Sequence, residues 1–124
     1  MTPQKQTKVT TADQHGNCFS ACLASLLDVS IDTVPDFSNI ENWHDEYERF
    51  LSDNGYEHNG CDTLGEWMDS NTFYIVGGYS PRGTSRGHAV IYKGTKPFFD
   101  PHPVNTFLTK PNEVYLIGIK SSLK

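Results

Sequence analysis

The sequence predicts an α+β domain in which helices come first and an antiparallel sheet follows. Apolar residues keep helical spacing in the first half of the chain, at residues 18–28 and 39–53. The second half changes to short β-branched and aromatic runs, at residues 72–76, 88–93, 96–99 and 114–119. A chain of 124 residues is long enough for one hydrophobic core, so we expect a single domain over residues 1–124.

The first helix is expected over residues 18–28, after an arm at residues 1–16 that carries few apolar side chains for packing. Its apolar residues fall on nearly every side, which predicts a buried helix rather than a surface one. Asn17 is a favourable N-cap residue and follows a glycine, so Cys18 is expected to be the first helical residue.

Two further short helices are expected before the sheet. The first covers residues 39–53, where one face carries the apolar side chains and Asn54-Gly55 ends the helix; the face consists of Ile40, Trp43, Tyr47, Phe50 and Leu51. The second begins at Thr63-Leu64-Gly65-Glu66, which matches a capping box, and ends at Ser70-Asn71. Leu64, Trp67 and Met68 would form the apolar stripe of this second helix.

The runs at residues 88–93 and 96–99 predict a β-hairpin around Lys93-Gly94-Thr95-Lys96. Pairing Ala89 or Val90 with Phe98 or Phe99 would bring the two ends of the hairpin together. Asp100 would then lie beside His88 at one edge of the sheet.

The start of the first helix suggests a reactive thiol. Free backbone N–H groups and the positive end of the helix dipole would surround the Cys18 sulfur, and such a setting favours the thiolate. Cys22 lies one turn further along the apolar helix and fits the role of a small buried hydrophobic residue. Cys61 is expected in a loop and has no partner in the pattern.

His88 opens a strand directly after Gly87, and the strand would hold its imidazole in a fixed place. A lone histidine there is also compatible with a purely structural role. Asp100 favours the functional interpretation, because a carboxylate that accepts from one ring nitrogen leaves the other nitrogen for a thiol proton. Cysteine, histidine and aspartate in this order therefore predict nucleophilic catalysis.

Four segments resemble the papain-like cysteine peptidase superfamily, and most of all its bacteriocin leader peptidase-like branch: Gln6, Asn17-Cys18-Phe19-Ser20-Ala21-Cys22-Leu23-Ala24, Gly87-His88-Ala89-Val90 and Asp100-Pro101. The chain also resembles small phage and bacterial proteins that have a Gly-Asn-Cys opening and an Asp-Pro-His-Pro segment. The resemblance covers most of the chain. It implies a papain-like fold, in which a buried N-terminal helix carries the nucleophile and packs on an antiparallel sheet.

The resemblance also implies roles for single residues. Cys18 would be the nucleophile, His88 the general base and acid, and Asp100 the group that orients the histidine. A glutamine before the cysteine would complete the oxyanion hole, and both Gln6 and Gln14 are candidates. The backbone N–H of Cys18 would supply the other oxyanion donor in either case.

Several further residues are candidates for substrate binding. Phe19 follows the nucleophile and would narrow a cleft. Residues 77–87 are rich in glycine and form either a surface loop or a lid, in which Arg82 and Arg86 would hold a carboxylate or phosphate. His102 lies between two prolines and is either a turn residue or a contact to substrate.

Composition limits the other classes. The formal net charge of -5 argues against non-specific nucleic-acid binding, and no apolar stretch reaches the length of a membrane span. The first twelve residues are polar and unlike a signal peptide, which with three cysteines favours a cytoplasmic protein. Cys18 and Cys22 have the spacing of half a zinc site, but no second Cys/His pair follows, so neither a metal nor a cofactor is expected.

These observations predict a cysteine hydrolase, a peptidase, amidase or isopeptidase that acts on a peptide or protein through a thioacyl-enzyme. Two alternatives stay open. An amine acceptor in place of water would make the protein a transglutaminase-like acyl transferase. A binding protein without turnover, which sequesters a host or partner component, would use the same fold.

Overall fold

The computed structural model describes residues 1–9, 16–79 and 87–119, and it confirms the α+β class. After the N-terminal arm come helix α1 (Cys18–Leu27), two short 3-10 helices (Ile31–Thr33 and Phe37–Asn39) and helix α2 (Trp43–Asp53). The strands that follow are β1 (Tyr56–Asp62), β2 (Phe73–Tyr79), β3 (Gly87–Lys93), β4 (Lys96–Phe99) and β5 (Lys110–Ile119).

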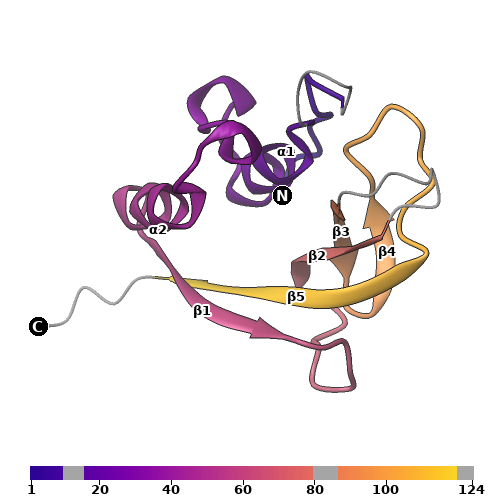
Figure 1. Ribbon diagram of the computed structural model, residues 1–124. Coiled ribbons are helices and arrows are strands. Elements are labelled where there is room, and N and C mark those ends of the chain that lie inside the picture. Colours follow the sequence, from indigo (N-terminus) through magenta and orange to yellow (C-terminus); the bar gives the residue numbers. More distant parts are fainter. Residues whose placement is uncertain (10–15, 80–86, 120–124) are drawn as a thin grey trace, which may run out of the picture.

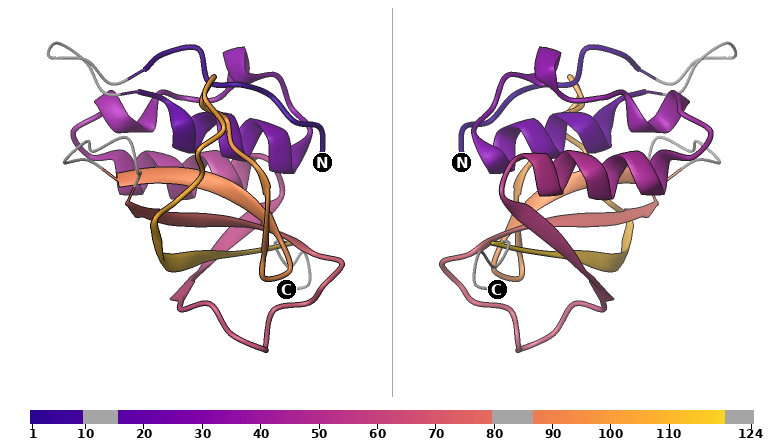
Figure 2. Two further views of the ribbon diagram at one scale, coloured as in Figure 1. Left: turned by 90° about the vertical axis from the view of Figure 1, so that its right-hand side faces the viewer. Right: turned by 90° about the vertical axis from the view of Figure 1, so that its left-hand side faces the viewer.

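The strands form one antiparallel sheet in the order β1-β5-β2-β3-β4. Both α-helices lie on the same face of this sheet (Figures 1 and 2). β4 is an edge strand and contains Pro97, which pairs with Tyr92. An edge is where a strand accommodates proline, because its missing N–H is not needed by a further neighbour.

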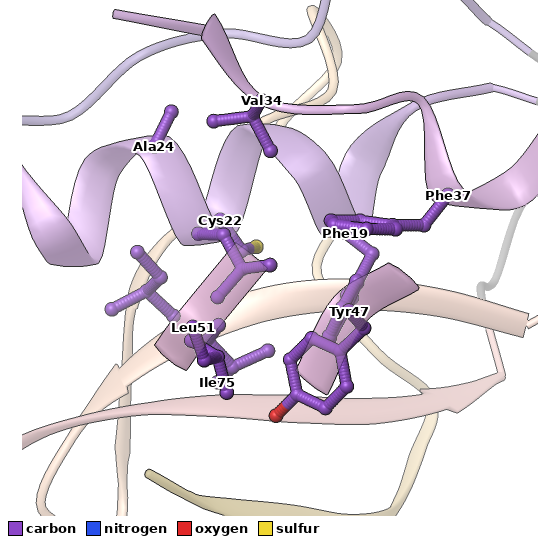
Figure 3. Packing of buried hydrophobic residues seen from close by; sticks show 11 residues of the cluster. Phe19, Cys22, Ala24, Val34, Phe37, Tyr47, Leu51 and Ile75 are labelled. Atoms are coloured by element: carbon purple, nitrogen blue, oxygen red, sulfur yellow. The ribbon is translucent and has the colours of Figure 1, made fainter. Parts of the chain in front are cut away.

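The main core lies between α1, α2 and the sheet. Figure 3 shows Phe19 and Cys22 of α1 among side chains that come from α2 and β2. The fully buried members include Leu23, Leu51 and Ile75, and Cys22 is as buried as they are. The prediction that α1 is a buried helix is therefore confirmed, and Cys22 lies in the core as expected.

A smaller cluster lies on the other face of the sheet and consists of Met68, Val76, Val90, Tyr92 and Val114. Successive residues of a strand point to opposite faces, so Val76 and Val90 belong to this cluster while Ile75 and Ile91 belong to the main core. Loop residues such as Leu64 and Phe107 cover it in place of a helix.

The helix predicted from Thr63 to Ser70 is wrong, because this segment forms turns. The indole N–H of Trp67 donates to the carbonyl oxygen of Thr63 at 2.8 Å, the acceptor that a helical N–H at position 67 would need. Asp69 Oδ1 accepts from the backbone N–H of Asn71 at 2.9 Å, which closes a local turn instead.

Strand β1 was not expected from the sequence, and Cys61 lies in this strand rather than in a loop. Its sequence Tyr-Glu-His-Asn-Gly-Cys-Asp is polar, and Gly60 has a positive φ of 99° within a bulge of the β1–β5 pairing. β1 needs little apolar character because it is the other edge strand of the sheet.

The hairpin of β3 and β4 is confirmed, with Gly94 in the left-handed region at φ 59°. Its predicted register is wrong: Phe99 pairs with Ile91, not with Ala89 or Val90. An irregularity between Ile91 and Tyr92 leaves Phe98 as an extra residue on β4.

Other features also differ from the expectations, and strand β5 begins at Lys110 rather than at residue 114. The expected helix over 39–53 begins only at Trp43, since a 3-10 helix occupies Phe37–Asn39. Strand β2 continues through Gly77 and Gly78 to Tyr79, so the glycine-rich segment begins as sheet. The arm at residues 1–9 is docked rather than loose, and Gln6 within it is only 9% exposed.

Candidate active site

Cys18 is the first residue of α1, as predicted, but Asn17 does not cap the helix with its side chain. Asn17 Oδ1 instead accepts from the backbone N–H groups of Thr7 and Lys8, at 3.0 and 2.8 Å. Asn17 thereby fixes the N-terminal arm beside the helix start. The N–H groups of Cys18 and Phe19 have no acceptor within the helix, because the first turn lacks preceding carbonyls.

The structure brings the side chains of Cys18, His88 and Asp100 together. His88 Nε2 lies 2.7 Å from Asp100 Oδ1, and Cys18 lies in the same cleft, near enough to the imidazole to help raise its pKa. Because Asp100 occupies Nε2, Nδ1 is the nitrogen left for the thiol. His88 is 7% exposed and Asp100 is 1% exposed, so the histidine–aspartate pair is shielded from water.

Asp100 is held by more than the histidine. Its Oδ1 also accepts from the N–H of His102 at 2.9 Å, and its Oδ2 accepts from the N–H of Phe107 at 2.8 Å. The carboxylate therefore organises the loop that follows β4 and receives a fixed orientation in return.

The charges of the pair follow from these contacts. Burial favours a neutral His88, but hydrogen bonds to Asp100 and Cys18 and their charges outweigh it and raise the pKa of His88 to about 9. Burial likewise opposes ionisation of Asp100, yet its hydrogen bonds from His88, His102 and Phe107 hold the pKa of this carboxyl below its usual value. Near neutral pH the pair is an imidazolium beside a carboxylate.

Cys18 and His88 open into a cleft of about 630 Å³. Its other lining residues come from the start of α1, the 3-10 helix before α2, the start of α2 and the ends of three strands: Phe19, Phe37, Ser38, Trp43, Gly77, Gly78, Tyr79, Gly87, Ala89, Asn112, Glu113 and Tyr115. Phe19 forms part of this wall and packs against four rings, of Phe37, Trp43, Tyr47 and Tyr115. A thiol, a charged imidazole and an aromatic wall therefore share one cavity.

Gln6 is buried near the candidate site but is not among the residues that line the cleft. Its backbone N–H donates to the carbonyl of Pro101 at 2.9 Å, and its side-chain Nε2 donates to the carbonyl of Lys8 at 2.6 Å. The amide nitrogen carries a second N–H beyond this bond. Gln14, the other glutamine considered for the oxyanion hole, lies outside the described residues.

Unlike Phe19, the other residues predicted to contact substrate are not among the described residues that line the cleft. His102 lies next to the pair, with its ring centroid 6.1 Å from that of His88, but its Nδ1 accepts from the N–H of Val104 and it does not line the cleft. Arg82 and Arg86 lie outside the described residues. Cys61 is exposed on β1 and is not part of the cleft.

Three residues at the site were missed by the sequence interpretation. Lys5 Nζ donates to the carbonyl oxygens of Asp100 and His102, both at 2.9 Å, and to Asn105 Oδ1 at 2.6 Å. Asn112 and Glu113 line the cleft. No local pattern indicates a role for Lys5, because its partners are about a hundred residues away in the chain. For Asn112 and Glu113, the only indication in the sequence is that they form a polar pair before Val114.

Comparison of the chain with protein-family models, with curated proteins and with solved structures gave no match. Within the described ranges, no group of three or more His, Cys, Asp or Glu side chains is arranged to hold a metal ion. No single described helix is long and apolar enough to cross a membrane, although Cys18–Leu27 and Ile31–Asn39, bent by 112°, pass together on length and composition.

Proposed function

We propose that this protein is a papain-like cysteine hydrolase that cleaves an amide bond in a peptide or protein. The observation that carries the proposal is the place of His88, whose imidazole is hydrogen-bonded to the Asp100 carboxylate and lines one cleft together with Cys18, the residue that opens α1. This is the nucleophile, base and orienting group that thiol catalysis requires, and the cleft beside it has room for a peptide segment.

In the proposed reaction, the three groups act in turn. The Cys18 thiolate attacks the acyl carbon, and the N–H of Cys18 stabilises the oxyanion from the helix start. The His88 imidazolium donates its proton to the leaving amine, so that a thioester and a free amine form. His88 then takes a proton from the water that attacks the thioester, and the collapse of this adduct releases the acid and regenerates the Cys18 thiolate beside the His88 imidazolium. This chemistry needs no cofactor.

The packing of a buried helix on an antiparallel sheet supports the papain-like assignment, because that superfamily carries its nucleophile at the start of such a helix. Gln6 is the described glutamine that would give the second oxyanion donor, through the amide N–H that Lys8 does not take. All three cysteines are free thiols, which fits a reducing compartment, and we assign the protein to the cytoplasm.

One observation favours a second function, a binding protein without turnover. The Gln6 amide is directed to the Lys8 carbonyl, and Gln6 does not line the cleft. Without this donor the same cleft would hold a peptide of a host or partner protein and would not cleave it. Reactivity toward a peptidyl ketone probe with a carboxylate leaving group separates the two functions, since a retained but inactive thiol would not displace that group and would stay unlabelled.

The test is covalent capture by a peptidyl acyloxymethyl ketone, read by intact mass and peptide mapping. We expect a single adduct on Cys18 that disappears in Cys18→Ala and in His88→Ala. Cys61→Ala is the matched control, because it removes an exposed thiol outside the cleft and should leave labelling unchanged. Equal labelling of Cys18 and Cys61 would contradict the proposal. Product analysis of a cleaved peptide in the presence of an amine then separates hydrolysis from acyl transfer.

A further inference from the structure

The cleft beside Cys18 contains one acidic side chain at a defined place on the sheet. Glu113 of β5 pairs with Gly77 of β2, and Gly77 pairs with Ala89 of β3. Paired residues of neighbouring strands share a face, so Ala89, Gly77 and Glu113 form a row across the floor of the cleft. Ala89 directly follows His88 in β3. The row therefore leads from the strand that carries His88, across the small residues Ala89 and Gly77, to the Glu113 carboxylate.

The two glycines of β2 keep this floor open. A Cβ at Gly77 would lie 3.4 Å from Cγ and Oε1 of Glu113, so any larger side chain at position 77 would fill the space over the row. Between Gly77 and Gly78 the register with β5 shifts, which leaves Asn112 as an extra residue at the rim of the cleft. Bulges of this kind often redirect side chains beside functional sites.

Glu113 is positioned by one neutral donor. The hydroxyl of Tyr115 donates to Glu113 Oε1 at 2.9 Å, and burial together with Glu113 raises the pKa of Tyr115 well above its usual value. Among residues 1–9, 16–79 and 87–119, no lysine or arginine forms an ion pair with Glu113. A carboxylate has two acceptor oxygens, and the bond from Tyr115 uses one of them, Oε1, while the side chain as a whole lines the cleft.

Aromatic rings surround the same space. Phe19, Trp43 and Tyr115 all line the cleft, and the Phe19 ring lies 5.0 Å from that of Tyr115 and 6.1 Å from that of Trp43. Ring faces attract cations, and a carboxylate next to them adds a charged acceptor. The combination suits a long side chain with an apolar stem and a cationic head.

We propose that Glu113 and the rings beside it select a peptide substrate with a lysine or arginine side chain next to the acyl group that Cys18 attacks. The inference rests on the proposed hydrolase function and adds the substrate class. The scale fits: two interstrand steps of about 5 Å each separate Ala89 from Glu113, a span that an extended basic side chain and a glutamate bridge together.

The first measurement compares acyloxymethyl ketone probes that carry arginine or its neutral isostere citrulline at either of the two residues before the reactive group. We expect wild type to be labelled about tenfold faster by an arginine probe. Glu113→Gln keeps an acceptor for Tyr115 and should bring the ratio of the two rates close to one. Glu57→Gln is the matched control at an exposed position of β1 and should preserve the preference. Lysine and norleucine probes repeat the comparison.

The second measurement needs no turnover. Fluorescent arginine and citrulline peptides are titrated onto Cys18→Ala and onto Cys18→Ala/Glu113→Gln, and anisotropy gives their affinities. Tighter binding of the arginine peptide that depends on Glu113 and weakens with salt supports the inference, even if no probe ever labels Cys18 and the hydrolase proposal fails. Equal affinity for both peptides in Cys18→Ala overturns the inference, even if Cys18 is labelled rapidly.

Discussion

Lys5 Nζ lies 2.9 Å from the main-chain oxygen of Asp100, although 95 residues separate them in the chain. The same ammonium group also reaches His102 and Asn105, so one side chain of the N-terminal arm holds three points of the loop that presents Asp100. Asp100 in turn fixes His88. The orientation of the candidate histidine thus depends on a lysine that does not touch it.

Replacement of Lys5 tests this dependence. Lys5→Met keeps the apolar stem and removes three hydrogen bonds, so we expect the free energy of unfolding to fall by about 1–2 kcal/mol. A looser Asp100 loop should also lower the pKa of His88, measured by NMR titration of its ring. Lys96→Met, at the exposed end of β4, is the control that should change neither quantity. A loss of stability with an unchanged histidine pKa would show that Lys5 supports only the fold.

Asp100→Asn removes the charge beside His88 but keeps a side chain of the same shape. We expect the pKa of His88 to fall well below about 9, because the carboxylate hydrogen bond and charge that raise it are lost. The rate of Cys18 acylation should fall about a hundredfold or more, as neutral amides orient a catalytic histidine poorly. Labelling rates and the NMR titration measure both effects; an unchanged rate would remove Asp100 from the proposed mechanism.

The stability contributed by His88 should depend on pH in a definite direction. Its folded pKa is raised from 6.5 to about 9, so the protonated ring stabilises the fold fully below pH 6.5 and this contribution is lost as pH rises through about 9. The difference in unfolding free energy between wild type and His88→Gln should therefore narrow over this range. Denaturant titrations at several pH values measure it, and a difference that widens would be the contrary result.

Asp100 should show the opposite dependence. Its folded pKa lies below 3.8, so its contribution is present above that pH and is lost as pH falls through the folded pKa. The advantage of wild type over Asp100→Asn should therefore shrink in acid and not in base, which separates the two titrations.

Gly77 and Gly78 are neighbours on β2 but should respond differently to alanine. A Cβ at Gly78 would lie 2.2 Å from the carbonyl oxygen of Lys110, so we expect Gly78→Ala to lower stability by about 3 kcal/mol. A Cβ at Gly77 would meet the side chains of Glu113 at 3.4 Å and Tyr115 at 3.7 Å, which are ordinary contacts, so Gly77→Ala should fold but accept bulky probes more slowly. Thermal melts and labelling rates of both variants decide this, and equal melting temperatures would contradict the expectation.

The candidate triad could be found in the sequence because each member lies in a local pattern. Cys18 opens an apolar helix, His88 is the second residue of an apolar strand, and Asp100 directly follows the strand paired with it. The predicted register was wrong by the extra residue at Phe98, yet the two ends of the hairpin still meet. A short hairpin brings its ends together in either register, which made this part of the prediction robust.

The other features depend on side-chain hydrogen bonds and on a strand pairing that apolar spacing and capping patterns do not show. The capping box at Thr63 gives way because Trp67 and Asp69 take backbone partners that a helix would need. β1 is polar because it is stabilised by pairing with β5, at the far end of the chain, rather than by burial. Gln6 was selected by resemblance alone, and its bond to Lys8 follows from how the arm folds back.

Residues 5–8 of the N-terminal arm form hydrogen bonds both to the loop of Asp100 and to the residue before Cys18. Lys5 holds the loop of Asp100, while Thr7 and Lys8 donate to Asn17, the residue before Cys18. If residues 5–8 separate from the rest of the fold, the Asp100 loop and Asn17, which precedes Cys18, lose their hydrogen bonds to the arm at the same time. The amide protons of Lys8 and Phe107, far apart in the chain, should then exchange with solvent through a common opening, which makes this short arm a single cooperative unit with the reactive centre.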